Sequence, residues 1–165
     1  MKTVYTIGYE GTDIDRFVKT LEAVGVEAIA DVRAVPLSRK KGFSKNVLRE
    51  RLQGAGISYI PMQELGDPKP GREAAKAGEY DRFRTIYSEH IDQPDVASVV
   101  EKLAADAEDM VVCLLCFERD PKTCHRFIVG ERMAAFGYEM MHLYGDDPAR
   151  YVRNQDRLPK RAAAG

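Results

Sequence analysis

Short apolar segments alternate with longer segments of helical periodicity along almost the whole chain, and this alternation constrains the fold more than any other feature. Strands are expected at 3–7, 26–32, 57–60, 110–116 and 139–143. Helices are expected at 14–24, 45–53, 79–91, 94–105 and 124–136. Strands that alternate with helices form parallel sheets through right-handed crossovers. The sequence therefore predicts an α/β fold, a single domain with about five mostly parallel strands and helices on both faces.

The 165 residues fit one domain, because a chain of this length buries roughly 70% of its unfolded surface without help from disulfides. We expect the domain to span 1–145, with a long loop at 64–78 and a basic, flexible tail at 146–165. The longest unbroken apolar run, 110–117, is far shorter than the ~20 residues that cross a bilayer, so no membrane segment is expected. Three cysteines and no export signal predict reduced thiols in the cytoplasm.

Positive charge is concentrated in two segments, although the net charge is -1. Residues 33–51 hold seven basic side chains and one acid, and residues 150–165 hold five and one. Such segregation steers anionic partners to one part of a near-neutral protein. The alternative for both segments is an ordinary solvated surface. The charge pattern excludes a uniformly basic nucleic-acid coat, and it leaves an anionic small molecule or a nucleic acid as the expected partner.

Ionisable side chains collect where four of the expected strands end. The residues concerned are Tyr9 and Glu10, Asp31 and Arg33, Cys116, Glu118 and Arg119, and His142. In an open parallel sheet the binding site lies outside the carboxyl ends of the strands. Each residue alone has a structural explanation, such as a core histidine or a capped turn, so the convergence carries the prediction. The sequence predicts a site at this edge of the sheet.

The segment from Cys116 to Arg126 carries the most specific chemistry. It leaves an apolar strand and enters a helix that Thr123 is expected to cap, with Cys124 and His125 in the first turn. A helix N-terminus attracts anions and favours a thiolate. Cys124 is therefore a candidate reactive thiolate, and the alternative is a small residue that packs under the turn.

Metal binding is weighed at the same edge. Cys113 and Cys116 have zinc-like spacing, but residues three apart in a strand point to opposite faces, so Cys113 is expected in the core. The carboxylates of Glu10, Asp31 and Glu118 offer a second set of ligands, for a divalent metal. Ion pairs of Asp31 and Glu10 with Arg33 or Arg126 are the favoured alternative, and no cofactor is assigned.

The loop 36–44 adds cations, hydroxyls and backbone amides beside the expected site. Ser38 and Arg39 are its candidate binding residues, and Ser44 is expected to begin a helix. Long loops of this composition often close over a ligand. The loop is therefore interpreted as a clamp for phosphate or carboxylate groups.

Several motifs, taken in order, resemble those of the domain-of-unknown-function 488 family. They are Thr6-Ile7-Gly8-Tyr9-Glu10-Gly11, Asp31-Val32-Arg33, Pro36-Leu37-Ser38-Arg39, Gly56-Ile57-Ser58-Tyr59 with Leu65-Gly66, Leu114-Leu115-Cys116-Phe117-Glu118 and Cys124-His125-Arg126. The resemblance runs from about Thr3 to His142. It implies a compact bacterial or archaeal α/β domain and brings no established reaction with it. The turn at 31–33 also resembles that of sulfurtransferase domains, whose cysteine loop this chain lacks.

Three hypotheses of function follow. In the first, an enzyme-like protein binds a phosphate-bearing anion through Arg33, Arg39 and Arg126. Glu10, Asp31 and Glu118 do acid–base or metal work, Cys124 and His125 form a nucleophile pair, and Tyr9, Ser38, Cys116 and His142 complete the substrate contacts. The second is thiol redox chemistry or sulfur transfer through Cys116 and Cys124. The third is a non-catalytic adaptor that binds nucleic acid or protein through the basic segments. The reaction and the oligomeric state stay open.

Overall fold

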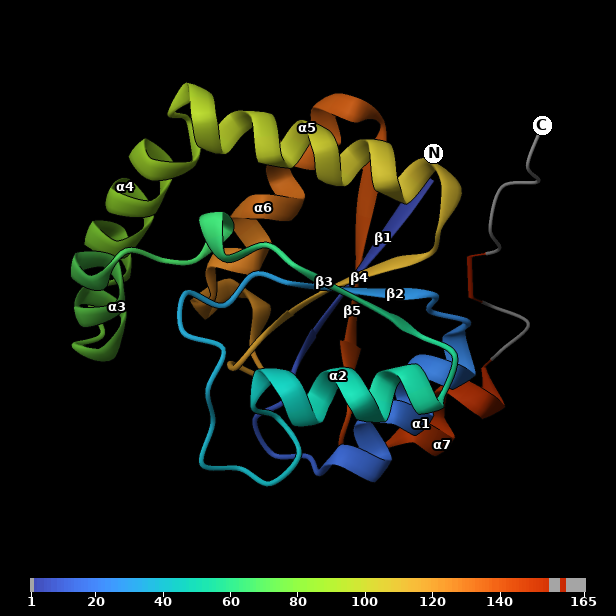
Figure 1. The fold of residues 1–165 in the computed structure, drawn as a ribbon. Coiled ribbons are helices and arrows are strands. Elements are labelled where there is room, and N and C mark those ends of the chain that lie inside the picture. Colours follow the sequence, from blue (N-terminus) through green and yellow to red (C-terminus); the bar gives the residue numbers. More distant parts are fainter. Residues whose placement is uncertain (1, 155–157, 160–165) are drawn as a thin grey trace.

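The computed structural model describes residues 2–154 and 158–159. Its strands are β1 (Lys2–Gly8), β2 (Ala28–Asp31), β3 (Ser58–Pro61), β4 (Val112–Cys116) and β5 (Tyr138–Tyr144). They form one sheet in the order β3-β2-β4-β1-β5, and every neighbouring pair is parallel. The prediction of a five-stranded parallel α/β domain is therefore confirmed (Figure 1).

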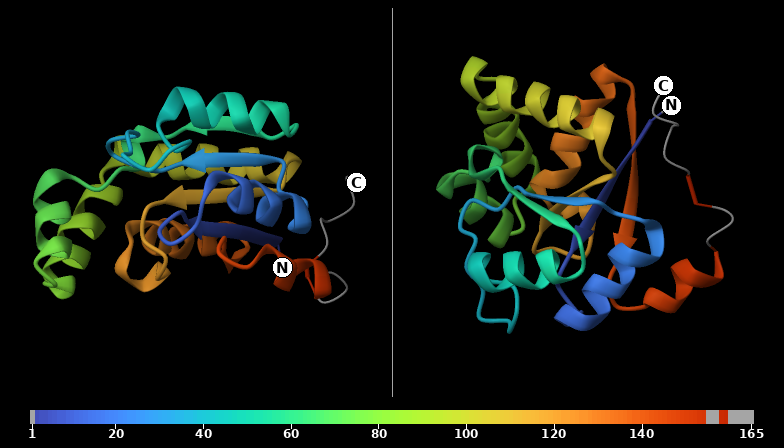
Figure 2. Two further views of the ribbon diagram at one scale, coloured as in Figure 1. Left: turned by 90° about the horizontal axis from the view of Figure 1, so that it is seen from below. Right: turned by 45° about the vertical axis from the view of Figure 1, so that its right-hand side comes forward.

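Helices cover both faces of the sheet. They are α1 (Ile14–Val24), α2 (Lys45–Gly54), α3 (Lys69–Lys76), α4 (Tyr80–Ile91), α5 (Pro94–Asp109), α6 (His125–Met133) and α7 (Pro148–Arg153). Helices α1, α2 and α7 contribute to the core on one face, and α3 to α6 contribute to the core on the other. Figure 2 shows α3 and α4 standing beyond the carboxyl ends of the strands. This end of the sheet is therefore partly roofed by helices.

Local chemistry explains where the elements begin and end. Helix α1 follows Asp13, whose carboxylate accepts a hydrogen bond from the Arg16 backbone amide at 2.9 Å. The helix buries Phe17 and Leu21, and it ends at Gly25, whose φ of 76° suits a residue without a side chain. The amphipathic pattern and both caps are visible in the sequence, so the predicted bounds of this helix are confirmed.

Strand β4 runs through the centre of the sheet, and its side chains alternate between the two cores. Cys116 joins the core under α5 and α6, whereas Cys113 joins the core under α1 and α2. Both side chains are buried, Cys113 completely. The predicted divergence of these two cysteines is confirmed, and Cys113 is a core residue.

The segment 64–78 is not a long loop as predicted. Gln63–Leu65 forms a 3₁₀ turn and Lys69–Lys76 forms α3. Pro70 lies in the first turn of α3, where a missing amide hydrogen costs nothing, so the prolines here begin a helix rather than prevent one. Gly71 packs so closely that a Cβ atom would lie 2.0 Å from an Asp67 carboxylate oxygen.

Both ends of the helix expected at 124–136 also differ from the prediction. Pro121–Thr123 forms a 3₁₀ turn, so Cys124 is the N-cap residue and α6 begins at His125; the Thr123 hydroxyl instead donates to the Asp120 carbonyl. Helix α6 ends at Met133, and a second 3₁₀ turn occupies Ala134–Phe136.

Part of the expected flexible tail is helical. Pro148 begins α7, and the buried Tyr151 accepts a hydrogen bond from the Tyr144 backbone amide at 2.6 Å. One buried aromatic side chain is enough to fix this short helix against the domain. Residues 155–157 and 160–165 of the expected tail lie outside the described residues.

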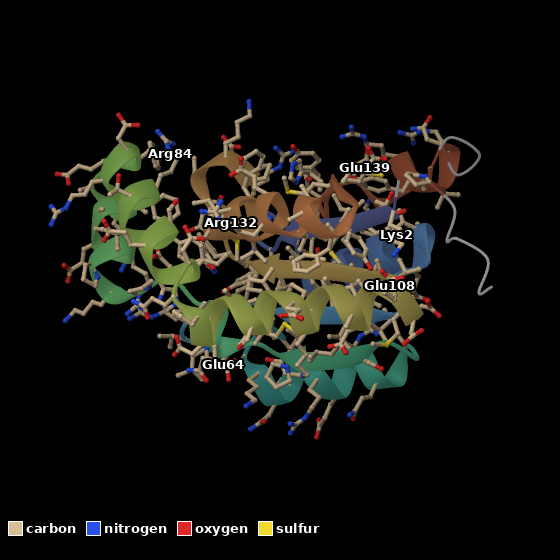
Figure 3. The ribbon with its side chains drawn as sticks, turned by 90° about the horizontal axis from the view of Figure 1, so that it is seen from above. Lys2, Glu64, Arg84, Glu108, Arg132 and Glu139 are labelled. Atoms are coloured by element: carbon tan, nitrogen blue, oxygen red, sulfur yellow. A yellow bond between two sulfur atoms is a disulfide. The ribbon has the colours of Figure 1, made fainter. Side chains whose placement is uncertain are left out.

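Two ion pairs lie on the charged surface over α5 and α6. Figure 3 shows Lys2 beside Glu108, with which it forms an ion pair, and Arg132, which pairs with Asp92 at 3.0 Å. Exposed pairs of this kind contribute little to stability. No helix among the described residues has the length and apolar character needed to cross a membrane.

The connections divide at β4. The chain leaves β1 and β2 toward α1 and α2 on one face, and it leaves β4 toward α6 on the other. Because β4 lies between β1 and β2, this switch opens a crevice at its carboxyl end. The topology thus places a site beside Cys116.

Candidate functional site

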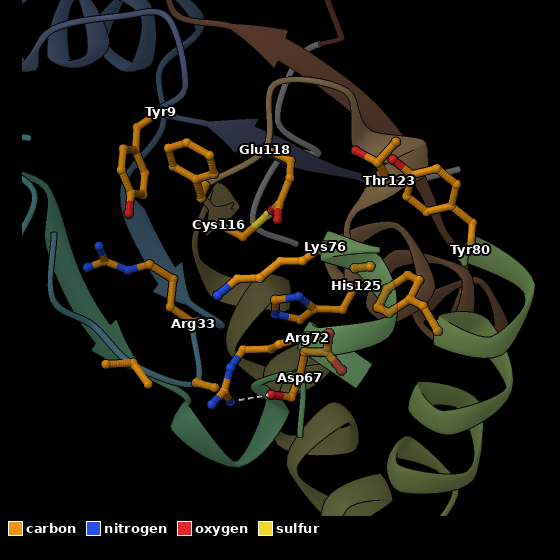
Figure 4. A pocket seen from close by; sticks show the side chains of 15 residues that line it. Tyr9, Arg33, Asp67, Arg72, Lys76, Tyr80, Cys116, Glu118, Thr123 and His125 are labelled. Carbon is orange, nitrogen blue, oxygen red and sulfur yellow. Dashed lines mark hydrogen bonds between the residues drawn. The ribbon is translucent and has the colours of Figure 1, made fainter. Parts of the chain in front are cut away.

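A cavity of about 260 Å³ occupies this crevice (Figure 4). It is closed by the ends of β1, β2 and β4, by the start of α6 and by the helices α3 and α4. Its polar and sulfur-bearing lining comprises Tyr9, Arg33, Asp67, Arg72, Lys76, Tyr80, Cys116, Glu118, Thr123 and His125. The volume lies just below the range of about 300–1,000 Å³ typical of small-molecule pockets, so the cavity suits a small metabolite.

The structure brings most of the predicted site residues to this place. Those that line the cavity are Tyr9, Arg33, Cys116, Glu118 and His125. Those that contact the lining residues from behind are Asp31, Cys124 and Arg126. Four others, Glu10, Ser38, Arg39 and His142, are not among the lining residues.

The residues outside the lining have other contacts or face solvent. Glu10 accepts a hydrogen bond from the Arg119 backbone amide at 2.9 Å. The Ser38 carbonyl accepts from the Ser44 hydroxyl at 3.1 Å, within the 36–44 loop. Arg39 is exposed, and His142 lies 2.6 Å from the Thr6 hydroxyl, within the strands rather than beyond their ends.

Arg33 and Asp31 form a buried, two-pronged ion pair. Arg33 Nε donates to Asp31 Oδ1 at 2.9 Å and Nη2 donates to Oδ2 at 2.8 Å. Burial alone lowers the pKa of Arg33, but hydrogen bonds and the charge of Asp31 outweigh it and raise that pKa overall. Tyr59 also donates to Asp31 at 2.5 Å. The predicted ion pairing of this carboxylate is confirmed, and its oxygens are occupied.

Cys116 and Cys124 form a disulfide at the floor of the cavity. Cys116 lines the cavity and Cys124 lies behind it, and both are almost completely buried. The sequence predicts reduced thiols, so the disulfide corrects that expectation. The pairing arises because β4 ends at Cys116 and the 3₁₀ turn 121–123 brings the chain back to it.

Arg126 is completely buried against the same sulfur. Its Nη1 atom lies 3.0 Å from Cys116 Sγ and donates to the Glu118 carbonyl, and Nη2 donates to the Arg119 carbonyl at 3.3 Å. Nε donates to the Thr6 hydroxyl at 3.2 Å. Burial lowers the pKa of Arg126 to about 10. Within the described part of the chain no carboxylate forms an ion pair with this guanidinium.

His125 presents one nitrogen to Cys124. Its Nε2 atom lies 2.6 Å from the Val32 carbonyl, which can only accept, so Nε2 carries the hydrogen. Nδ1 is then the basic nitrogen, and it lies 3.8 Å from Cys124 Sγ. Burial lowers the pKa of His125 to about 4, so the ring is neutral at pH 7. This geometry lets His125 accept a proton from a Cys124 thiol.

Glu118 completes the surroundings of Cys116. Its Oε2 atom lies 3.4 Å from Cys116 Sγ, and burial raises the pKa of its carboxyl group. Ligand atoms of Cys116, Glu118 and Cys124 lie within 4.8 Å of one another, as a metal site requires. The donor set fits a thiophilic metal only when the disulfide is reduced, and the Arg126 cation against one sulfur opposes a second cation there.

Five polar residues of the cavity were missed as site residues in the sequence: Asp67, Arg72, Lys76, Tyr80 and Thr123. Asp67, Arg72 and Lys76 lie on the segment interpreted as a loop, and Arg72 and Lys76 are one turn apart on α3. Arg72 donates to the Asp67 backbone carbonyl at 2.8 Å. The available signal was the spacing of four residues between Arg72 and Lys76, which places two side chains on the same face of a helix.

The model of a family described as "Domain of unknown function DUF488" matches residues 13–133. The chain belongs to this family. The match contains every lining residue of the cavity except Tyr9, which precedes it. No curated protein and no solved structure matches the chain, so the DUF488 assignment brings no reaction with it. The function must therefore be argued from the site.

Proposed function

We propose that this protein exchanges electrons between its Cys116–Cys124 pair and small anionic thiols and disulfides bound in the cavity. The observation that carries the proposal is the contact of Arg126 with Cys116 Sγ at 3.0 Å. A buried cation without a carboxylate partner is costly unless another anion compensates it. A Cys116 thiolate supplies that anion in the reduced protein, and the guanidinium stabilises it in return.

Cys116 is the attacking sulfur in this proposal because it lines the cavity, whereas Cys124 does not. The thiolate of Cys116 attacks one sulfur of a substrate disulfide, and the substrate sulfur–sulfur bond breaks. The first thiolate product leaves and takes a proton from water. A mixed disulfide between Cys116 and the second half of the substrate remains.

Cys124 then resolves the mixed disulfide. His125 Nδ1, 3.8 Å away, accepts the Cys124 thiol proton, and the Cys124 sulfur attacks Cys116 Sγ. The Cys116–Cys124 bond forms, and the second substrate thiolate leaves with the proton that His125 held. The protein dithiol is oxidised by two electrons, and one disulfide is reduced to two thiols. Excess thiol drives the same steps in reverse.

The remaining cavity residues support the anionic character of the substrate. Arg72 and Lys76 bring two positive charges to the cavity wall, while Arg33 is already neutralised by Asp31. The proposal thus joins two of the hypotheses drawn from the sequence: an anionic ligand and chemistry at Cys116 and Cys124.

The test is a redox titration of the folded protein. Wild-type protein is equilibrated in buffers of defined oxidised-to-reduced dithiothreitol ratio, alkylated and weighed by mass spectrometry. We expect two labels to appear together at one midpoint, on Cys116 and Cys124. Cys113→Ala is the matched control, because it removes a buried cysteine on the opposite face and should leave the midpoint unchanged.

Two variants complete the design. Cys116→Ser and Cys124→Ser should each lose the two-electron transition. The proposal fails if the disulfide of folded wild-type protein resists reduction until the protein unfolds. It also fails if the two sulfurs are labelled independently of each other.

A further inference from the structure

The α3 wall of the cavity carries a donor site and an acceptor site side by side. Arg72 and Lys76 project from successive turns of α3, and Asp67 immediately precedes the helix. Figure 4 shows Arg72 beside Asp67, to whose backbone carbonyl it donates at 2.8 Å. The carboxylate of Asp67 is not used in that hydrogen bond. Positive and negative groups thus face the same small volume.

Asp67 is the unusual member of this wall. The residue is 4% exposed, and its Oδ1 atom accepts no hydrogen bond from any described residue. Burial raises the pKa of its carboxyl group to about 7, although Arg72 acts in the opposite direction. A buried carboxyl oxygen without a donor is destabilising, and a water, an ion or a ligand that donates to it or binds it removes that cost.

The two cations of this wall, Arg72 and Lys76, also lack carboxylate partners among the described residues. Among the described residues neither Arg72 nor Lys76 forms an ion pair, whereas the third cation of the cavity, Arg33, is held by Asp31. A ligand that pairs with all three side chains of this wall must therefore carry an anionic group for Arg72 and Lys76 and a hydrogen-bond donor for Asp67, close to each other. An α-amino acid carries both groups on one carbon.

We infer that the substrate is a zwitterionic amino-acid thiol or its disulfide, with its carboxylate bound by Arg72 and Lys76 and its ammonium group bound by Asp67. The inference rests on the proposed function for the role of sulfur, because Cys116 lines the same cavity. The cavity volume of about 260 Å³ restricts the bound half to the size of a small metabolite.

The experiment compares small disulfides that differ in charge. Reduced wild-type protein is mixed with cystine, dianionic 3,3′-dithiodipropionate, neutral 2-hydroxyethyl disulfide or dicationic cystamine. Closure of the Cys116–Cys124 bond is followed by mass spectrometry. Each rate constant is divided by that of the same disulfide with free dithiothreitol, which removes differences of intrinsic reactivity. We expect cystine to be fastest, the dianion next and cystamine slowest.

Variants test separately the binding of the ammonium group by Asp67 and the binding of the carboxylate by Arg72. Asp67→Asn should lower the rate with cystine about tenfold and should not lower the rate with 3,3′-dithiodipropionate, because only cystine carries the ammonium group. Arg72→Gln should lower both rates about tenfold. Lys69→Gln, which removes an exposed cation of the same helix outside the cavity lining, is the matched control for Arg72 and should change neither.

The outcomes separate this inference from the proposed function. Equal normalised rates for all four disulfides overturn the zwitterion inference and leave disulfide exchange intact. A loss of the dianion rate in Asp67→Asn equal to the loss for cystine also overturns it, because Asp67 would then act without reading the ammonium group. Failure of every disulfide to oxidise the reduced pair overturns the proposed function itself.

Discussion

Two buried arginines stand at the ends of neighbouring strands and differ in what compensates their charge. Arg33, after β2, is clasped by both oxygens of Asp31. Arg126, which reaches the end of β4 from α6, contacts a hydroxyl, two backbone carbonyls and the sulfur of Cys116. The first arginine completes a closed neutral unit. The second stays a cation directed at the sulfur that we propose to be redox-active, so the same residue type has a carboxylate partner in one place and a sulfur partner in the other.

The largest expected effect on stability comes from breaking the ion pair between Arg33 and Asp31. Arg33→Gln leaves Asp31 as a buried charge without its cation, and we expect the free energy of unfolding to fall by about 3–5 kcal/mol. Urea unfolding at pH 7 followed by circular dichroism measures it. Arg82→Gln, which breaks an exposed pair with Glu79, is the control and should cost less than about 1 kcal/mol. A loss from Arg33→Gln no larger than that of the control would contradict the structural role of this pair.

The fold could be predicted because its signals are local. The strand–helix alternation, the cap at Asp13 and the terminating Gly25 are all readable in order along the chain. The predictions failed where a helix is short and stabilised by packing. Helices α3 and α7 have eight and six residues, carry prolines in their first turns, and bury residues such as Ala74 and Tyr151.

The site was predicted in part, for a physical reason. Residues at strand ends could be located from the topology, and Tyr9, Arg33, Cys116, Glu118 and His125 do line one cavity. Asp67, on a segment interpreted as a loop, could not be placed, and nothing local shows that its carboxylate would be buried without a donor. The wall formed by α3 was missed with it.

The basic segment 33–51 shows why charge counts do not define a surface. Arg33 forms an ion pair with Asp31, and Arg51 forms one with Asp15 at 3.5 Å. Lys40 donates to the Thr12 carbonyl at 2.6 Å. These cations are close together in the sequence, but in the folded protein several of them are paired with other protein groups. Binding of nucleic acid by this segment stays a prediction, tested by affinity at low and high salt.

Asp67 extends the comparison to an acid whose Oδ1 atom accepts no hydrogen bond from the described residues, and its substitution should have the second largest effect. The pKa of Asp67 is raised by burial to about 7, so the folded state retains a proton that the unfolded state releases near pH 4. Stability from this group is present below pH 4 and is lost as the pH rises through 7. Asp67→Asn does not titrate, so we expect its stability to match that of wild type near pH 4 and to exceed it by up to about 4 kcal/mol at pH 8, since three pKa units correspond to that free energy.

Urea unfolding of both proteins across this pH range measures the difference. His125, whose pKa is lowered by burial to about 4, destabilises the fold as the pH falls from about 6.5 to 4. It is present in both proteins and cancels when their free energies of unfolding are subtracted. The exposed Asp95→Asn serves as the matched control for the loss of one carboxylate, and its stability difference from wild type should change less with pH than that of Asp67→Asn. A stability difference for Asp67→Asn that does not grow with pH would show that this carboxyl group is satisfied in the folded protein.

The smallest expected effect is on the alkylation rate of Cys116, and it tests whether Arg126 stabilises the Cys116 thiolate. In a Cys124→Ser background, where no disulfide can close, Arg126→Gln should slow alkylation of Cys116 at pH 7 about tenfold, because a charge-assisted hydrogen bond to the thiolate is lost. Arg126→Lys should restore part of the rate by keeping the charge. Arg119→Gln removes an exposed cation of the same loop and is the matched control. Circular dichroism restricts the measurement to folded variants. If Arg126→Gln and Arg119→Gln slow alkylation equally, Arg126 acts only through long-range charge, and the contact of 3.0 Å with Cys116 is structural like that of Arg33 with Asp31.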